Sequence, residues 1–174
     1  MQALYNAFAS IREFMELGGD VLYAIMFVVF LMWVFIIERI WFLYFVAPGR
    51  VRATVQIWDE RSDTTSWFAK QIRMAMISEV DTDLHRNIFM VKTLIALCPL
   101  LGLLGTVTGM IGVFDVMAVS GTGNARAMAA GVSKATVPTM AGMVAALSGV
   151  FFSTQLQARA DAQIDLLEDN LQHH

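Results

Sequence analysis

Residues Leu94 to Phe114 read LIALCPLLGLLGTVTGMIGVF, a run of twenty-one residues without a charged side chain. At a rise of about 1.5 Å per residue, a helix of this length crosses a hydrocarbon core of roughly 30 Å. Four glycines in the run are spaced three, four and three residues apart, so they share one helix face: Gly102, Gly105, Gly109 and Gly112. A face without side chains favours close approach of another helix. The run therefore predicts a tightly packed membrane assembly.

The composition of the whole chain is that of a membrane protein. Of the 174 residues, 57% are hydrophobic and 16% are charged, and the charges avoid three windows. We therefore expect an all-α integral membrane protein with three transmembrane helices, which is not an enzyme, because no hydrophilic stretch is large enough for a separate catalytic domain. The expected segments are a leader (1–20), a first span (21–47), a loop (48–92), a second span (93–118), a turn (119–127), a third span (128–155) and a tail (156–174).

The distribution of basic residues predicts the orientation of the spans. The loop over 48–92 carries seven lysines and arginines, whereas the other side carries only Arg12 and Arg126. Because basic loops stay on the cytoplasmic side, we expect this loop and the C-terminal tail to be cytoplasmic and helical, and the N-terminus to be periplasmic.

The leader has the features of a retained segment. It carries Glu13, Glu16 and Asp20, and no small-residue cleavage site follows the apolar run, which argues against a secretory signal peptide. Apolar residues at helical spacing favour a short amphipathic helix at the membrane surface, although a partly ordered polar leader fits equally well: Leu4, Phe8, Ile11 and Met15.

The third span repeats the small-residue pattern of the second. Small side chains alternate four and three residues apart and form a ridge on one face: Ala135, Thr139, Gly142, Ala146, Gly149 and Ser153. Only Gly149 interrupts the helical pattern between Ser148 and Leu171, so we expect one unbroken helix from the third span into the tail.

Folding the second and third spans as a hairpin about Asn124 predicts which residues share a depth. Asp115 then lies level with Lys134, and an ion pair between them would compensate two charges near the membrane surface. Alternatively, Lys134 extends alone to the interface. The same register sets Thr106 against Met143 and Thr139 against Met110, so the two threonines lie at different depths. Two prolines within the spans, Pro99 and Pro138, are expected to bend their helices.

The sequence lacks the residue patterns of several common functional sites. The glycine run has no GK[ST] ending, His85 is isolated in the sequence, and His173 and His174 have the appearance of a tag remnant. We therefore expect no metal site, no cofactor and no nucleic-acid partner. No Asp or Glu lies near the centre of a span, although proton pathways usually need a titratable group there. If the assembly moves protons, another chain must supply the carboxylate.

The runs CPLLGLLGTVTGMIGVF and GVSKATVPTMAGMVAALSGVF together resemble the paired membrane signature of the ExbB/TolQ/MotA proton-channel family. The resemblance covers roughly residues 94–152, with the Glu38–Arg39 pair that ends the first span, and the layout is closest to the ExbB branch. It implies a homopentamer in the lipid of the bacterial inner membrane, whose second and third helices line a pore. It also implies an ExbD-type partner whose aspartate carries protons, so that the motor energises a TonB-type protein for outer-membrane uptake of iron complexes or vitamins.

The resemblance assigns the pore threonines to Thr106 and Thr139. From spacing alone, hydroxyls bonded to their own backbone would be the better interpretation. The chain departs from the family pattern at Lys134, where its relatives usually carry glutamate, and also at Thr136 and Pro138. Two alternatives stay open, namely a TolQ-like motor for envelope constriction and a passive oligomeric scaffold.

Overall fold

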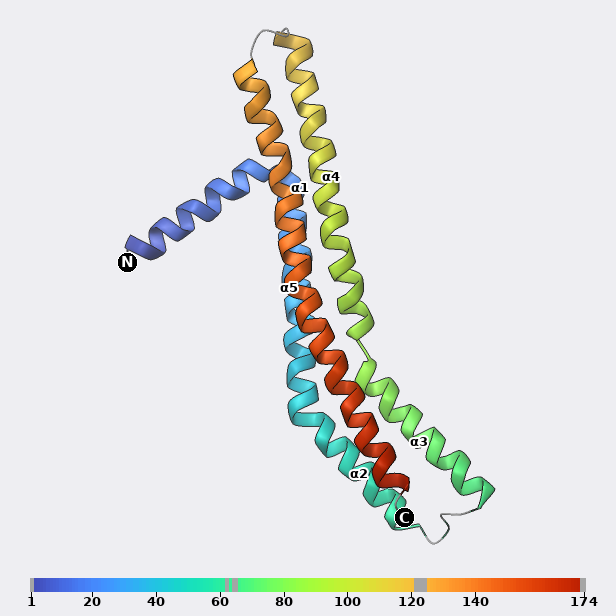
Figure 1. The fold of residues 1–174 in the computed structure, drawn as a ribbon. Helices are drawn as coiled ribbons and strands as arrows, with labels where there is room; N and C mark the ends of the chain where they lie inside the picture. The colour runs from blue at the N-terminus through green and yellow to red at the C-terminus, as the bar shows by residue number, and fades with distance from the viewer. Residues whose placement is uncertain (1, 62, 64–65, 121–124, 173–174) are drawn as a thin grey trace. The chain divides into compact units, whose positions relative to one another are not determined.

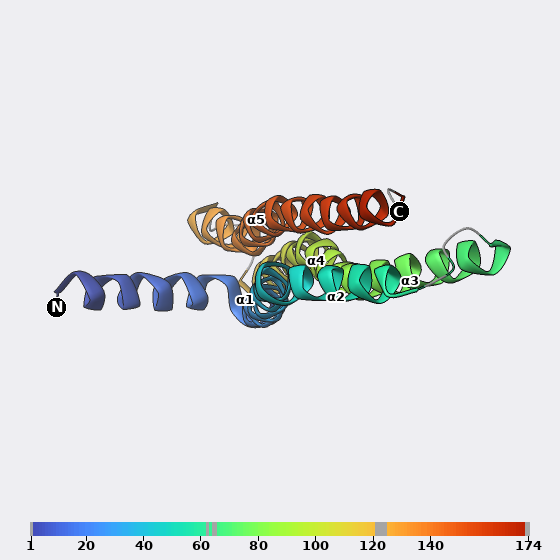
Figure 2. The same ribbon diagram turned by 90° about the horizontal axis from the view of Figure 1, so that it is seen from below.

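The computed structural model describes residues 2–61, 63, 66–120 and 125–172, and every regular element among them is a helix. Figures 1 and 2 draw these helices from two directions. In chain order they are α1 (Gln2–Trp41), the short π-helix η1 (Phe42–Val46), α2 (Ala47–Asp59), α3 (Trp67–His85), α4 (Ile88–Ser120) and α5 (Ala125–Gln172).

Three stretches of the described chain are long and apolar enough to cross a membrane: Gly19–Asp59, Trp67–Val119 and Met128–Leu171. The chain divides into two compact units, and α1, α4 and α5 contribute to both. Unit 1 comprises Met1–Met32 and Thr93–Gly149, and unit 2 comprises Trp33–Lys92 and Val150–His174. The described chain thus adopts an all-helical fold with three helical stretches that fit a membrane protein.

In unit 1, α4 and α5 approach each other at backbone distance. A β-carbon added to Gly102 would lie 2.9 Å from Cα of Thr139, and one added to Gly109 would lie 2.6 Å from Cβ of Ala135. A β-carbon on Gly142 would overlap the carbonyl oxygen of Cys98. Real side chains do not tolerate such distances, so these positions admit only glycine without a shift of the helices.

The remaining glycines of the two spans divide into packed and open positions. Gly105 accommodates the ring of Pro138, and Gly149 accommodates Ile95 and Met32. Gly131, which the spacing pattern did not single out, packs against Val113. Gly112 differs, because a β-carbon there would meet no atom within 4 Å.

The outer surface of unit 1 is apolar. Large side chains point away from the packed centre and are half or more exposed, among them Phe27 (62%), Leu100 (61%), Phe114 (58%) and Leu147 (70%). An exposed apolar surface of this kind fits lipid or further protein chains rather than water.

α1 breaks once, at Gly19. The φ of 64° and ψ of −162° at this residue lie in a region open essentially to glycine alone, and the chain changes direction there. Residues 2–18 before the break are helical. The expected apolar face of this leader depends on Leu4, Phe8, Ile11 and Met15, whose side chains lie outside the described residues, as do Asn124 of the turn and His173 and His174.

Unit 2 has its own core and its own helix ends. Trp58 and Leu84 are almost fully buried, and Trp33 packs edge-on against Phe152 at 5.0 Å between ring centroids. The Ser66 hydroxyl accepts a hydrogen bond from the Ala69 amide at 3.1 Å and caps the start of α3.

The junction between α3 and α4 is set by Asn87. This residue has a φ of 64°, a left-handed conformation that asparagine tolerates better than most residues and that stops a helix. α4 then begins at Ile88, and the Val91 amide donates to the Asn87 carbonyl at 3.0 Å. The two helices are therefore joined by a very short connection whose geometry depends on one residue.

The single helix expected from the third span onward is confirmed, since α5 runs through 48 residues without interruption. Pro138 lies inside α5 and Pro99 lies inside α4. Because proline lacks an amide proton, each leaves the carbonyl four residues earlier without its helical hydrogen bond. These carbonyls belong to Lys134 and Ile95.

Close packing at Gly142 predicts a sharp sensitivity to one methyl group. We expect Gly142→Ala to destabilise the protein by about 1–3 kcal/mol, because the new methyl overlaps the backbone of Cys98. Gly49→Ala is the control, since Gly49 is also helical and has open space around it; it should be neutral or stabilising by up to about 1 kcal/mol. Thermal unfolding in mild detergent measures both changes, and equal melting temperatures for the two variants would contradict the packing described.

Candidate functional site

The two threonines that the resemblance singled out meet at the contact between α4 and α5. The hydroxyl of Thr106 makes a hydrogen bond to the hydroxyl of Thr139, and Thr139 Oγ1 donates to the Gly102 carbonyl at 2.8 Å. The predicted register, in which Thr106 faced Met143 and Thr139 faced Met110, was therefore wrong. Thr106 meets the residue about one turn earlier on α5, because Pro138 fits against Gly105 and Ala135 against Gly109.

The neighbouring residues fix the position of both hydroxyls. Pro138 precedes Thr139, is fully buried, and rests on the notch that Gly105 leaves in α4. Gly102 lets the backbone of Thr139 approach closely enough for the interhelical hydrogen bond. Thr106 and Thr139 both stay partly exposed at the edge of the contact, so a further group outside the chain can reach them.

The hydrogen bonds give the pair a defined order of donors and acceptors. A hydroxyl has one proton and two acceptor lone pairs. When Thr139 donates to Gly102, Thr106 can donate to Thr139, and the oxygen of Thr106 still has lone pairs for an outside donor. Thr106 also lies 3.4 Å from the Gly102 carbonyl, which offers its proton a second acceptor. The pair can therefore change its hydrogen-bond order without moving either helix.

The structure does not bring Asp115 and Lys134 together within the chain. Both side chains are exposed, and neither forms an ion pair or hydrogen bond among the described residues. The reason is again the register: Val113 packs against Gly131 and Gly109 against Ala135. Asp115 is consequently about five residues further along α4 than the position opposite Lys134, a rise of about 7–8 Å.

The Glu38–Arg39 pair of α1 lies at the α3–α4 junction. Arg39 is only 3% exposed, its Nη1 donates to the Asp83 carbonyl at 3.2 Å, and its Nε is 3.3 Å from Glu38 Oε2. The Asp83 carbonyl is one of the last four of α3, which have no partner inside the helix. Glu38 in turn accepts from the Asn87 side chain at 3.5 Å. The pair therefore ties α1 to the end of α3, a role that its sequence position did not indicate.

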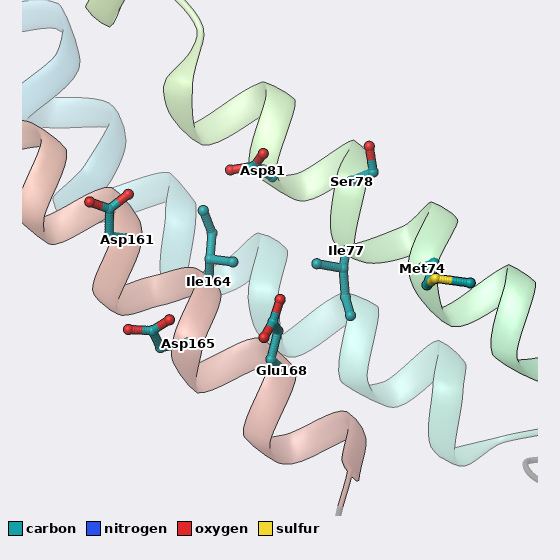
Figure 3. Close-up of a pocket in the computed structure, with 8 residues that line it drawn as sticks. All are labelled: Met74, Ile77, Ser78, Asp81, Asp161, Ile164, Asp165 and Glu168. Carbon is teal, nitrogen blue, oxygen red and sulfur yellow. The ribbon is translucent and has the colours of Figure 1, made fainter.

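An acidic groove lies between α3 and α5 in unit 2 and has a volume of about 490 Å³. Figure 3 shows four carboxylates and four other side chains that line it: Asp81, Asp161, Asp165, Glu168, Met74, Ile77, Ser78 and Ile164. Among the described residues, no group of three or more His, Cys, Asp or Glu side chains is placed to hold a metal ion. Sequence patterns did not indicate this groove, because its two walls are about eighty residues apart.

Comparison with known proteins places these features in a family context. The model of the MotA/TolQ/ExbB proton channel family matches residues 49–169, which is more than half of the chain and includes both threonines. The matched range covers α3, α4 and most of α2 and α5.

Two proteins of Synechocystis sp. are similar to part of the chain. One, named biopolymer transport protein ExbB-like 1, is 36% identical over 99 residues, covering 53% of this chain and 39% of its own length. The other, named ExbB-like 3, is 31% identical over 104 residues, covering 57% and 50% respectively. The matched part of the chain thus spans 39% and 50% of the lengths of these two curated relatives.

The threonine hydrogen bond predicts an energetic coupling between α4 and α5. Thr106→Val and Thr139→Val each remove a hydroxyl with little change in shape, and the double-mutant cycle should give a coupling of about 0.5–1.7 kcal/mol. Thr136→Val is the control, because its exposed hydroxyl bonds only to Ser133 of its own helix. Unfolding measured in mild detergent gives all four values, and strictly additive effects of the two valines would show that the hydroxyls do not interact.

The contacts of Arg39 at the α3–α4 junction predict that two arginines contribute unequally to stability. Arg39→Ala should destabilise the protein by about 2–3 kcal/mol, because a buried charged donor to the Asp83 carbonyl is lost. Arg50→Ala should cost less than about 1 kcal/mol, since Arg50 is 58% exposed where it pairs with the Asp83 carboxylate at 3.1 Å. Chemical denaturation of the two variants measures the difference. A smaller loss of unfolding free energy in Arg39→Ala than in Arg50→Ala would show that the Arg39 contacts do not stabilise the junction.

Proposed function

Because the chain belongs to the MotA/TolQ/ExbB proton channel family, we propose that it is a pore-forming, stator-type subunit of a proton-driven motor in a bacterial inner membrane. The relatives are named biopolymer transport proteins of the ExbB-like kind, which supports the ExbB branch rather than a TolQ-like motor. In this role the subunit works with an ExbD-type partner and energises a TonB-type protein for outer-membrane uptake of iron complexes or vitamins.

The observation that carries the proposal is the apposition of the Thr106 and Thr139 hydroxyls. They form the polar point of an α4–α5 contact that is otherwise built from glycine, alanine, proline and apolar side chains. The uncharged runs of these helices contain no Asp or Glu. A proton path along this surface therefore needs a carboxylate from a partner helix, for which these hydroxyls would be the hydrogen-bonding contact.

The two threonine hydroxyls can form hydrogen bonds with such a carboxyl group in both its protonated and its ionised state. A protonated carboxyl group donates to the free lone pair of Thr106 while Thr106 donates to Thr139. An ionised carboxylate accepts from Thr106 instead, and the Thr139 hydroxyl continues to donate to the Gly102 carbonyl. The site thus holds the partner group before and after proton transfer, with only the Thr106 hydroxyl rotating.

The assembly that we propose is a homopentamer around a pore. In it the second and third spans of each copy face the centre, and the exposed apolar side chains of unit 1 contact lipid or the neighbouring copies. The basic residues of 48–92 favour a cytoplasmic location for that segment and for the tail, with the N-terminus periplasmic.

A valine substitution separates conduction from assembly. We expect Thr139→Val to lower proton-driven uptake by about tenfold, the factor that corresponds to about 1.4 kcal/mol, because valine removes the hydrogen-bonding group and keeps the shape. Thr106→Val removes the hydroxyl that contacts the partner carboxylate and should lower uptake at least as much. Growth on a scarce iron complex and proton flux into vesicles measure function, while the elution volume of the detergent complex measures assembly.

The conservative variant Thr139→Ser retains the hydroxyl and should restore most of the uptake, and Thr136→Val should leave it unchanged. Normal uptake in Thr106→Val, Thr139→Val and the double variant would refute the proposed site. A chain that elutes as a monomer in every detergent, and shows a monomer mass in native mass spectrometry, would refute the proposed homopentamer.

A further inference from the structure

His85 at the end of α3 stands between two carboxylates from two different helices. Its Nδ1 is 2.7 Å from Asp81 Oδ1 on α3, and its Nε2 is 3.0 Å from Asp161 Oδ1 on α5. The ring is about one third exposed, so water reaches it. All three residues belong to unit 2. The imidazole therefore joins α3 to α5 across the end of the acidic groove.

The protonation state of the ring decides whether both contacts are hydrogen bonds. A neutral imidazole carries one N–H and presents a lone pair on its other nitrogen, whereas the protonated ring donates from both nitrogens. An ionised carboxylate only accepts. Both contacts of His85 can therefore be satisfied together only when the ring is positively charged.

The other charges around the groove make this positive ring important. Asp81 on α3 faces Asp161, and Asp165 and Glu168 follow along α5 (Figure 3). Two other polar contacts tie the surroundings of α5 to neighbouring helices: Lys92 of α4 donates to Gln157, and Arg73 of α3 donates to the Glu168 carbonyl at 3.3 Å. Neither places a cation between Asp81 and Asp161. Without a charged His85, these two carboxylates repel each other across the contact.

We propose that His85 is a pH-sensitive latch that holds the end of α3 on α5 when it is protonated and releases it when it is neutral. The charge of a histidine side chain ordinarily changes between about pH 5 and pH 8. This latch lies in a different unit from the threonine pair, and the inference holds whether or not the chain conducts protons.

The direction of the pH effect follows from the protonation state of His85 that makes the additional hydrogen bond between α3 and α5. The protonated ring gains two charged contacts in the closed arrangement, so the latch is complete at low pH. As pH rises the ring loses its proton, one hydrogen bond is lost, and the repulsion between carboxylates is no longer offset. Release of α3 from α5 is therefore expected on the alkaline side.

Distance measurements between the two helices test the latch directly. Spin labels are attached at Ala75→Cys on α3 and Ala162→Cys on α5, two small exposed positions, in a full chain with Cys98→Ala. Labelled chains are diluted with unlabelled ones so that each pair of labels reports a single copy. Between pH 5.5 and pH 8.5, the ratio of the population with the short distance to the population with the long distance should fall by about tenfold. This factor corresponds to the loss of one hydrogen bond of about 1.4 kcal/mol to a charged group.

Two substitutions identify the group responsible. His85→Gln cannot become charged, so its distance distribution should be the same across this pH range and should already contain the long component at pH 5.5. Asp161→Asn removes the acceptor on α5 and should likewise flatten the response. A distance that does not change with pH in the unsubstituted chain overturns the proposal. A response that persists in His85→Gln overturns it too, and assigns the effect to other groups such as His173 and His174.

Discussion

The contact between the backbones of α4 and α5 is the constraint on which the rest of unit 1 depends. Where Gly142 meets the Cys98 carbonyl and Gly102 meets Thr139, there is no room for a single methyl group. In a membrane, where apolar side chains gain little by leaving lipid, such close packing is the main source of helix association. Because side chains are absent at the contact, the few polar atoms there come within hydrogen-bond distance of each other.

The same constraint fixes the height of one helix against the other. Glycine notches on α4 accept particular side chains of α5, so sliding by one residue would set Pro138 or Ala135 against a position that carries a side chain. The hydroxyl pair is a consequence of that fit. Its geometry therefore follows from the packing of the glycines of α4 and α5 against the facing helix.

The sequence alone predicted the parts of this arrangement that depend on local pattern. Charge-free windows predicted three helices long and apolar enough to span a membrane, and the lack of breakers after Gly149 predicted one long α5. The glycine spacing of the second span predicted close packing, which Gly102, Gly105 and Gly109 show and Gly112 does not. Register was not predictable in this way, because the middle of a hairpin cannot be read from spacing when the turn offers several candidate positions. Matching Pro138 to the notch at Gly105 was the available signal. It would have set Thr106 opposite Val137, within two residues of Thr139 and closer than the predicted Met143.

Contacts between distant segments were also beyond the reach of sequence patterns. Asp81, one partner of His85, lies four residues earlier on the same helix, but the second partner, Asp161, follows 76 residues later on another helix. Likewise, the Glu38–Arg39 pair reads as the end of a span, whereas its function in the structure is to bind the carbonyl end of α3 and the side chain of Asn87. Such roles depend on how helices are arranged in space, which periodicity along one helix does not specify.

Pro138 has a mechanical consequence for the long helix that contains it. An uninterrupted helix of 48 residues, about 70 Å long, resists bending through its ladder of hydrogen bonds. The hydrogen bond that the Lys134 carbonyl would accept is missing, so the helix resists bending less between Lys134 and Pro138, next to Thr139. A load applied anywhere along this rod concentrates its curvature at that point. The hydroxyl contact is therefore located where the helix yields most easily, and a change in curvature is converted there into a change in hydrogen-bond distance.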